Sequence, residues 1–255
     1  METPPPVAVD LLIRNAWIVT MDEERRIYRD GALAILGDSI HAVGPTDAIA
    51  AAVTPRETID GRDFVLTPGF VNGHVHITGE PITRGYMPDD LDWRTNVFDW
   101  LIPTYMAQTP ADERLSAQFA ALEMLRTGTT CFVEAGTVID LDAVADGLAE
   151  TGIRARIGQW TQDRAFGGED QAALTRHAID GLEAQLDRYP GADHALIAAW
   201  PLLVGHNSAT DDLWRAATAR AVERGAGVSA HKSAAPADPA NYIETTRRRP
   251  NAQLE

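Results

Sequence analysis

The sequence has almost no cysteine, no long apolar run and a shortage of basic residues. Cys131 is the single cysteine among 255 residues, so the chain cannot form an internal disulfide. No run approaches the roughly 18 apolar residues that a membrane helix needs. The first six residues lack both the basic and the apolar segment of a signal peptide. These absences predict a cytoplasmic protein with no membrane partner.

The charge balance excludes a further class of binding partner. Lysine and arginine together number 22 against 37 acidic residues, a net charge of −15. Such a surface repels nucleic-acid phosphates, so we expect no nucleic acid partner. Hydrophobic residues at 45% and charged residues at 23% are typical of a globular protein, and 255 residues suffice for one large domain or two smaller ones.

The first part of the chain predicts a small β domain over residues 1–66. Two β-branched, apolar runs at 9–20 and 32–43 are broken by turn-type dipeptides such as Asp30-Gly31 and Gly44-Pro45. We expect these runs to form an antiparallel, sandwich-like unit.

From residue 67 to residue 255 the pattern alternates between strands and helices. Thr109 and Thr210 are suitable N-caps for two of the helices, and the segment 78–109 is a long, aromatic-rich excursion with no clean period. Such alternation predicts an α/β fold with a parallel sheet, and five strands correspond to an incomplete (β/α) barrel. The predicted strands are 67–77, 129–135, 153–160, 195–200 and 227–231, and the predicted helices are 110–126, 140–151, 170–188 and 211–224.

The first of these strands carries two histidines on one face. Side chains alternate along a strand, so His74 and His76 share a face, while Val75 and Ile77 lie on the other. In a barrel the apolar face packs under helices and the histidines point inward. Neutral imidazoles at this spacing can hold one metal ion, although an ordinary hydrogen-bonded strand gives the same pattern.

His231 repeats this arrangement at the end of the fifth strand. Val228 and Ala230 suit the helix layer, whereas Ser229 and His231 lie on the opposite face. Because all strand ends of a barrel open onto one rim, His231 can meet the two earlier histidines there. The sequence therefore predicts a metal site of three histidines.

Several motifs together resemble the amidohydrolase superfamily, in its branch of cytosine-deaminase-like, methylthioadenosine/S-adenosylhomocysteine-deaminase-like and triazine hydrolases. The resemblance covers nearly the whole chain but only about the N-terminal half of the family's length. The motifs that carry it are Pro-Gly-Phe-Val-Asn-Gly-His-Val-His at 68–76, Arg84-Gly85, Trp100-Leu101, Gly128-Thr129-Thr130 and Ser229-Ala230-His231.

The resemblance implies a hydrolase that acts on non-peptide carbon–nitrogen bonds of a small cyclic or heteroaromatic substrate. It assigns His74, His76 and His231 to a divalent metal, zinc first and iron(II) as the alternative. It assigns no catalytic residue, because Ala234 stands at the position of the family's glutamate, and the family's further histidine and aspartate ligands would follow Glu255. We therefore expect a partial barrel that belongs to a longer chain, forms a homo-oligomer or is completed by another chain. The alternative is an inactive half-barrel that binds a partner.

Other side chains are weaker candidates. Trp93 and Trp100 could wall an aromatic substrate, and Glu134 either faces the pocket or forms structural hydrogen bonds. For the remaining histidines we expect no role in the site. These are His41, His177, His194 and His206.

Overall fold

The protein is described by a computed structural model that covers residues 5–85, 87–191, 195–205, 207–249 and 251–253. Its contacts divide it into two compact units, with the boundary between Gly69 and Phe70. Within the described ranges, no helix is both long and apolar enough to cross a membrane.

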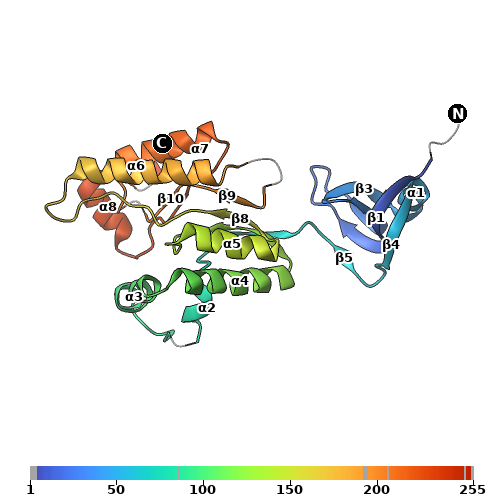
Figure 1. The fold of residues 1–255 in the computed structure, drawn as a ribbon, viewed down its shortest axis with the longest axis horizontal. Helices are drawn as coiled ribbons and strands as arrows, with labels where there is room; N and C mark the ends of the chain where they lie inside the picture. Colours follow the sequence, from blue (N-terminus) through green and yellow to red (C-terminus); the bar gives the residue numbers. More distant parts are fainter. Residues whose placement is uncertain (1–4, 86, 192–194, 206, 250, 254–255) are drawn as a thin grey trace. The chain divides into compact units, whose positions relative to one another are not determined.

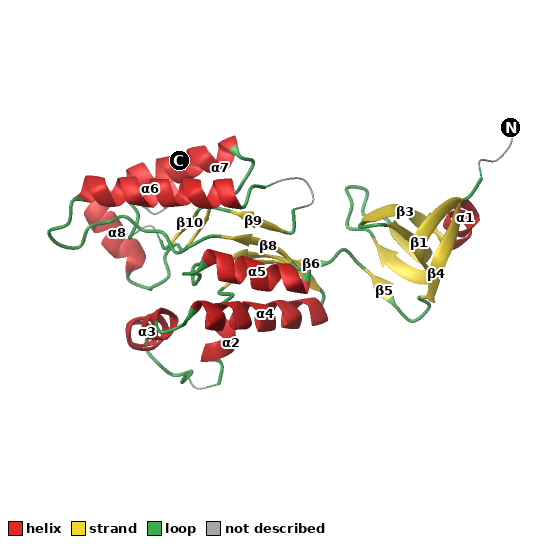
Figure 2. Ribbon diagram, in the orientation of Figure 1, coloured by secondary structure: helices red, strands yellow, loops and turns green. Residues whose placement is uncertain are grey.

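The first unit is one mixed sheet with a short helix packed on it (Figures 1 and 2). The strand order is β3-β2-β1-β4, and β5 also pairs with β1. The expectation of a purely antiparallel unit is wrong for β4 and β5, which run parallel to β1. The helix α1 explains the β4 pairing, because a helical crossover returns the chain in the direction of the preceding strand. The elements are β1 (Val7–Val19), β2 (Ile27–Leu36), β3 (Ser39–Pro45), α1 (Thr46–Ala52), β4 (Val53–Asp60) and β5 (Val65–Leu66).

The second unit is an open, parallel α/β arrangement, part of a (β/α) barrel. Its main sheet has the order β6-β7-β8-β9, and β10 pairs in parallel with β11 in a second, two-stranded sheet. Helices lie outside these strands, as Figure 2 shows for α4, α5 and α6. The strands are β6 (Phe70–Val75), β7 (Thr129–Glu134), β8 (Arg154–Ile157), β9 (Ile197–Ala199), β10 (Leu202–Leu203) and β11 (Ser229–Ala230).

The fourth predicted strand, 195–200, corresponds to β9, and a separate strand that was not predicted, β10, follows it. The chain from β9 to β10 passes through Trp200 and Pro201, and Pro201 has no N–H to donate to a ladder. β9 pairs with β8, whereas β10 pairs with β11. Because of this break, β9 and β10 belong to two different sheets, and β11 pairs in parallel with β10.

The four predicted helices, α4 to α7, begin within one residue of where the sequence places them, whereas α2, the π-helix, α3 and α8 were not predicted. The Thr109 side chain accepts a hydrogen bond from the Asp112 N–H in a capping box at the start of α4, and the Thr210 side chain accepts one from the Leu213 N–H at the start of α7. Gly152 ends α5 with a φ of 77°, a left-handed conformation that glycine adopts without strain. The helices of this unit are α2 (Glu80–Thr83), a π-helix (Thr95–Leu101), α3 (Ile102–Met106), α4 (Pro110–Arg126), α5 (Leu141–Thr151), α6 (Gln171–Arg188), α7 (Asp211–Glu223), α8 (Asp238–Thr246) and a 3-10 turn (Asn251–Gln253).

The core of this unit fixes which way its strands face. Val75 and Ile77 are fully buried in a cluster with Phe132, Val144 and Leu148, between the sheet and the helices α4 and α5. A second cluster packs α6 and α7 against Val228 and Ala230. Both strands that carry the predicted histidine ligands are therefore oriented by their apolar faces.

Candidate metal centre

The strand β6 presents His74 and His76 on the face opposite the core. The backbone N–H of His74 donates to the side chain of Asn72 over 3.1 Å, and that of His76 lies 3.4 Å from Oε1 of Glu80. These bonds hold the end of the strand where the chain turns into α2.

His231 follows β11 directly and its ring is held by the backbone. Ser229 Oγ donates to the carbonyl of Glu134 over 2.9 Å, which ties β11 to the end of β7. His231 Nδ1 lies 3.0 Å from the carbonyl oxygen of Val204. Because a carbonyl only accepts, Nδ1 carries the proton and the lone pair of Nε2 is free for a ligand.

The three imidazoles converge although 155 residues separate His76 from His231. One nitrogen from each of His74, His76 and His231 lies within 4.8 Å of the others. The rings of His76 and His231 are stacked with centroids 5.1 Å apart, and His74 stands edge-on to both at 5.2 Å. The structure thus brings together the three residues that the sequence singles out.

Burial keeps two of these rings neutral. It lowers the pKa of His76 from 6.5 to about 4, with smaller contributions from His231 and His74. Burial also lowers the pKa of His231, against the opposing hydrogen bond to Val204. The neutral imidazole is the form that binds a metal ion.

Two observations test whether a divalent cation fits here. The Nε2 atoms of His76 and His231 are 3.4 Å apart, and two nitrogens on one tetrahedral zinc ion at 2.0–2.1 Å are separated by about 3.4 Å. The buried Nδ1 of His76 has no hydrogen-bond partner among the described residues, so no hydrogen bond from that nitrogen opposes the ring orientation that coordination through Nε2 requires. The donor set of three imidazoles and the 3.4 Å spacing between His76 and His231 fit a zinc-like ion.

An apolar pocket of about 300 Å³ opens beside the histidines. Trp93 lines it, as predicted for an aromatic wall, and its ring stands edge-on to Phe98 at 5.8 Å. Trp100 is absent from the described lining. The described lining consists of His76, Trp93, Val97, Leu101, Ile102, Tyr105, Gly136, Trp160, Val204, His231 and Ala234.

Most of this wall is not evident from the sequence. Val97 and Leu101 come from the π-helix and Tyr105 from α3, in a segment without a readable period. The place of Trp160 in the wall could be predicted from the sequence, because Trp160 follows β8 and the strand ends of a barrel meet at one rim. Ala234, the position of the family's glutamate, does line the pocket, and the described lining contains no carboxylate.

Glu134 has a structural role, one of the two alternatives that the sequence left open. The side chain is completely buried, and its two oxygens accept hydrogen bonds from the backbone N–H groups of Gly136 and Thr137, 2.6 and 2.9 Å away. Burial raises its pKa to about 7, although these hydrogen bonds oppose the shift. Glu134 is not among the described residues that line the pocket, but it holds Gly136, which does line it.

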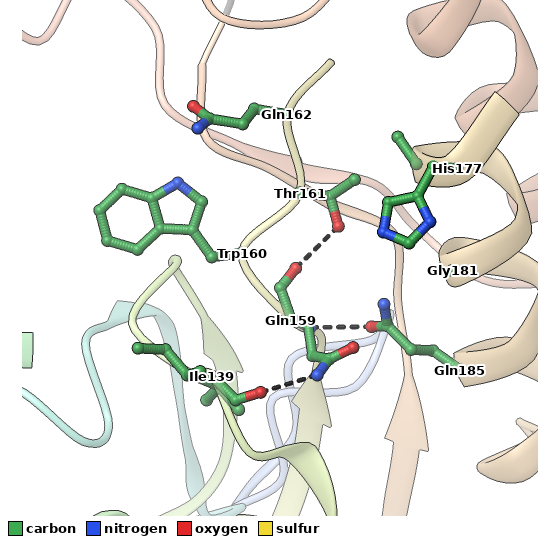
Figure 3. A pocket seen from close by; sticks show the side chains of 10 residues that line it. Ile139, Gln159, Trp160, Thr161, Gln162, His177, Gly181 and Gln185 are labelled. Atoms are coloured by element: carbon green, nitrogen blue, oxygen red, sulfur yellow. Dashed lines mark hydrogen bonds between the residues drawn. The ribbon is translucent and has the colours of Figure 1, made fainter. Parts of the chain in front are cut away.

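A second, polar hollow of about 260 Å³ lies between α6 and the chain that follows β8 (Figure 3). The Gln159 N–H donates to Gln185 Oε1 over 2.8 Å, and the Gln159 side chain donates to the carbonyl of Ile139 over 2.7 Å. Figure 3 shows the Trp160 indole pointing away from His177 and Gln185, so Trp160 separates this hollow from the histidine pocket. His177 is exposed on α6, outside the metal cluster; His194 and His206 lie outside the described residues.

Comparisons with known proteins all point to the same family. The model of the amidohydrolase family matches residues 65–248. A 5-methylthioadenosine/S-adenosylhomocysteine deaminase of Pelotomaculum thermopropionicum is 34% identical over 146 residues, which are 57% of this chain and 33% of that protein. Another of the same name, from Nitratidesulfovibrio vulgaris Hildenborough, is 33% identical over 200 residues, 77% of this chain and 43% of the relative.

Solved structures agree with the fold. The crystal structure of an adenosine deaminase from Xanthomonas campestris with bound zinc superposes with a TM-score of 0.80 and 26% identity, and covers 98% of this chain and 55% of its own. The zinc complex of an atrazine chlorohydrolase from Arthrobacter aurescens also gives 0.80, at 20% identity over 96% of this chain and 57% of its own, and shows the fold alone. The chain spans little more than half the length of these solved relatives and less than half that of the two curated ones.

Proposed function

This chain belongs to the amidohydrolase family, and we propose that it takes part in the metal-dependent hydrolysis of a carbon–nitrogen bond in a small heteroaromatic substrate. The observation that carries the proposal is the convergence of His74, His76 and His231 beside an apolar pocket. The names of the two curated relatives direct the substrate class to purine nucleosides that carry an exocyclic amine, such as 5'-methylthioadenosine and S-adenosylhomocysteine.

Zinc is the metal that we propose for the three histidines, with iron(II) as the alternative, because the donors are all imidazole nitrogens. A divalent ion bound there would lower the pKa of a bound water molecule to about 7 and so would supply a nucleophile at neutral pH. The carbonyl oxygen of Val204 orients His231, because it accepts a hydrogen bond from Nδ1–H and so keeps Nε2 directed at the site.

The pocket supports a flat, apolar ring. Trp93 and Tyr105 offer aromatic surface, and aliphatic side chains from the π-helix and α3 exclude water around the reacting carbon. The overall reaction adds water to the carbon and releases ammonia. Its leaving group needs a proton, and a general acid is typically worth 10² to 10⁴ in rate. Because Ala234 stands in the described lining where a glutamate would supply that proton, the donor must come from elsewhere.

This observation favours a second candidate, a half-barrel that binds the metal and ligand without turnover. The sheet adds a reason to expect a partner: within the described residues, β6 pairs only with β7, and β11 pairs only with β10. An unpaired strand edge exposes N–H and C=O groups that another strand can bind. We propose that a second copy or a complementing chain covers at least one of these edges, and that the protein is cytoplasmic.

The test combines metal analysis with two assays on the same preparation. Protein stripped of metal is titrated with zinc, and ammonia release is then measured from 5'-methylthioadenosine, S-adenosylhomocysteine and simple aminated heterocycles. Ligand binding is measured calorimetrically in parallel. Ammonia release that His231→Ala abolishes and His177→Ala preserves supports the hydrolase. Ligand binding without ammonia release supports the binding half-barrel, and the absence of zinc binding refutes both.

A further inference from the structure

The helix α4 carries apolar side chains on two opposite faces. Ala117, Ala120 and Ala121 are buried against the sheet and α5. Leu115, Phe119 and Leu122 are instead 53%, 59% and 49% exposed. They follow the spacing i, i+4, i+7 and therefore form one continuous outer stripe.

The flanks of this outer stripe are already engaged within the unit. On one side, Arg114 and Gln118 pair with Glu150 of α5. On the other, Glu123 pairs with Arg84 over 2.7 Å, beside α2. Figure 1 shows α4 between α5 and α2, so the neighbouring helices do not cover the outer stripe.

The outer stripe is complementary to itself when it is reversed. Asp112 and Arg126 lie seven residues before and after Phe119, and Leu115 and Leu122 lie four before and three after it. A two-fold axis through Phe119 therefore sets Asp112 of one helix against Arg126 of the other, and it brings Leu115 within one residue of the position opposite Leu122. Arg126 is exposed and forms no ion pair within the described part of the chain. Antiparallel helices also bring opposite ends of their dipoles together.

We propose that the outer stripe of α4 binds the same stripe of a second copy of this chain, antiparallel and centred on Phe119. The contact is isologous, with each residue of one copy meeting its symmetry counterpart, as in most homodimers. One helix pair buries less than the 1,200–2,000 Å² of a standard stable interface. The dimer is therefore weak and concentration-dependent. It does not depend on the proposed activity or on the open strand edges.

Sedimentation velocity over a wide range of protein concentrations tests the association. Wild-type protein is expected to shift from monomer to dimer, and Phe119→Glu to raise the dissociation constant at least tenfold, because it places two carboxylates on the symmetry axis. The matched control is Val222→Glu, which replaces an even more exposed apolar residue on α7 and leaves the dimer unchanged.

Two further variants test the register. In a Cys131→Ser background, Phe119→Cys is expected to form a disulfide with its own copy under mild oxidation, whereas Val222→Cys is not. Arg126→Asp is expected to weaken the dimer, with circular dichroism checking that the helix remains folded. A wild-type chain that stays monomeric overturns the proposal. So does a dimer that survives Phe119→Glu, since another surface, such as a strand edge, must then hold it.

Discussion

The three histidines should make the stability of the second unit depend on zinc. A ligand that binds only the folded state adds about 2.7 kcal/mol to the free energy of unfolding when its concentration is a hundred times its dissociation constant. For a unit that begins at Phe70 and extends to Glu255, this raises the melting temperature by about 5–11 °C.

His231→Ala tests the geometry behind this number. It removes one of three ligands, a larger change than the loss of an outer hydrogen bond, which alone weakens metal affinity by about 10- to 100-fold. If affinity falls 100-fold, the same zinc concentration stabilises by only about 0.4 kcal/mol, and the melting temperature rises by about 1–2 °C. The variant also loses the hydrogen bond to Val204, a change of about 1 kcal/mol that is present with and without zinc.

The assay compares melting curves with and without zinc for each variant, so that effects on the metal-free protein cancel. His177→Ala is the control, because His177 is exposed on α6 and outside the cluster; it should keep the full wild-type shift. A full shift in His231→Ala, or no shift in the wild type, would show that the three imidazoles do not act as one ligand set.

Three further substitutions probe the groups that shape the site. The buried carboxylate of Glu113 accepts hydrogen bonds from two backbone N–H groups, and Glu113→Ala leaves these groups without a partner. The substitution should therefore lower the free energy of unfolding, measured in urea, by about 2–5 kcal/mol. The exposed control Glu123→Ala should lower it by less than about 1 kcal/mol. The raised pKa of Glu134 means that the folded state holds this proton more tightly than the unfolded state. The free energy of unfolding should therefore fall by about 3 kcal/mol as the pH rises from about 4.5 to about 7. Urea titrations of Glu134→Gln across this range should show no such decline. In Gly79→Ala the new methyl group would lie 2.5 Å from the ring of Tyr105, which should cost about 1–3 kcal/mol in urea and weaken calorimetric ligand binding by displacing the pocket wall.

The regular parts of the second unit were predictable because local rules and burial agree there. The N-caps Thr109 and Thr210 act as their residue types suggest, and the alternation along β6 places Val75 and Ile77 in the core. The helix α4 shows the limit of such patterns. Its leucine and phenylalanine spacing predicts a helix correctly, but the structure uses alanines for the core and leaves Phe119 outside.

The remaining features depend on contacts that are distant in sequence. The parallel pairing of β4 with β1 follows from where the chain returns after α1, which no local pattern specifies. Both roles considered for Glu134 fit the strand parity, and only its complete burial distinguishes them. Trp93 and Trp100 were equivalent as aromatic residues of an irregular segment, yet only Trp93 is part of the described pocket wall.

The proposed metal ligands and the core side chains lie on opposite faces of the same strands, and this explains why the histidine cluster follows from the sequence while the reaction does not. A shift of one residue in β6 would expose Val75 and bury His74 or His76, a change that burial strongly opposes. The packing of Val228 and Ala230 similarly fixes His231. Ala234 lies three residues beyond, in the loop after β11, where no core contact dictates the side chain. The fold therefore maintains the ligand geometry, whereas the group that would transfer protons can change without disturbing it.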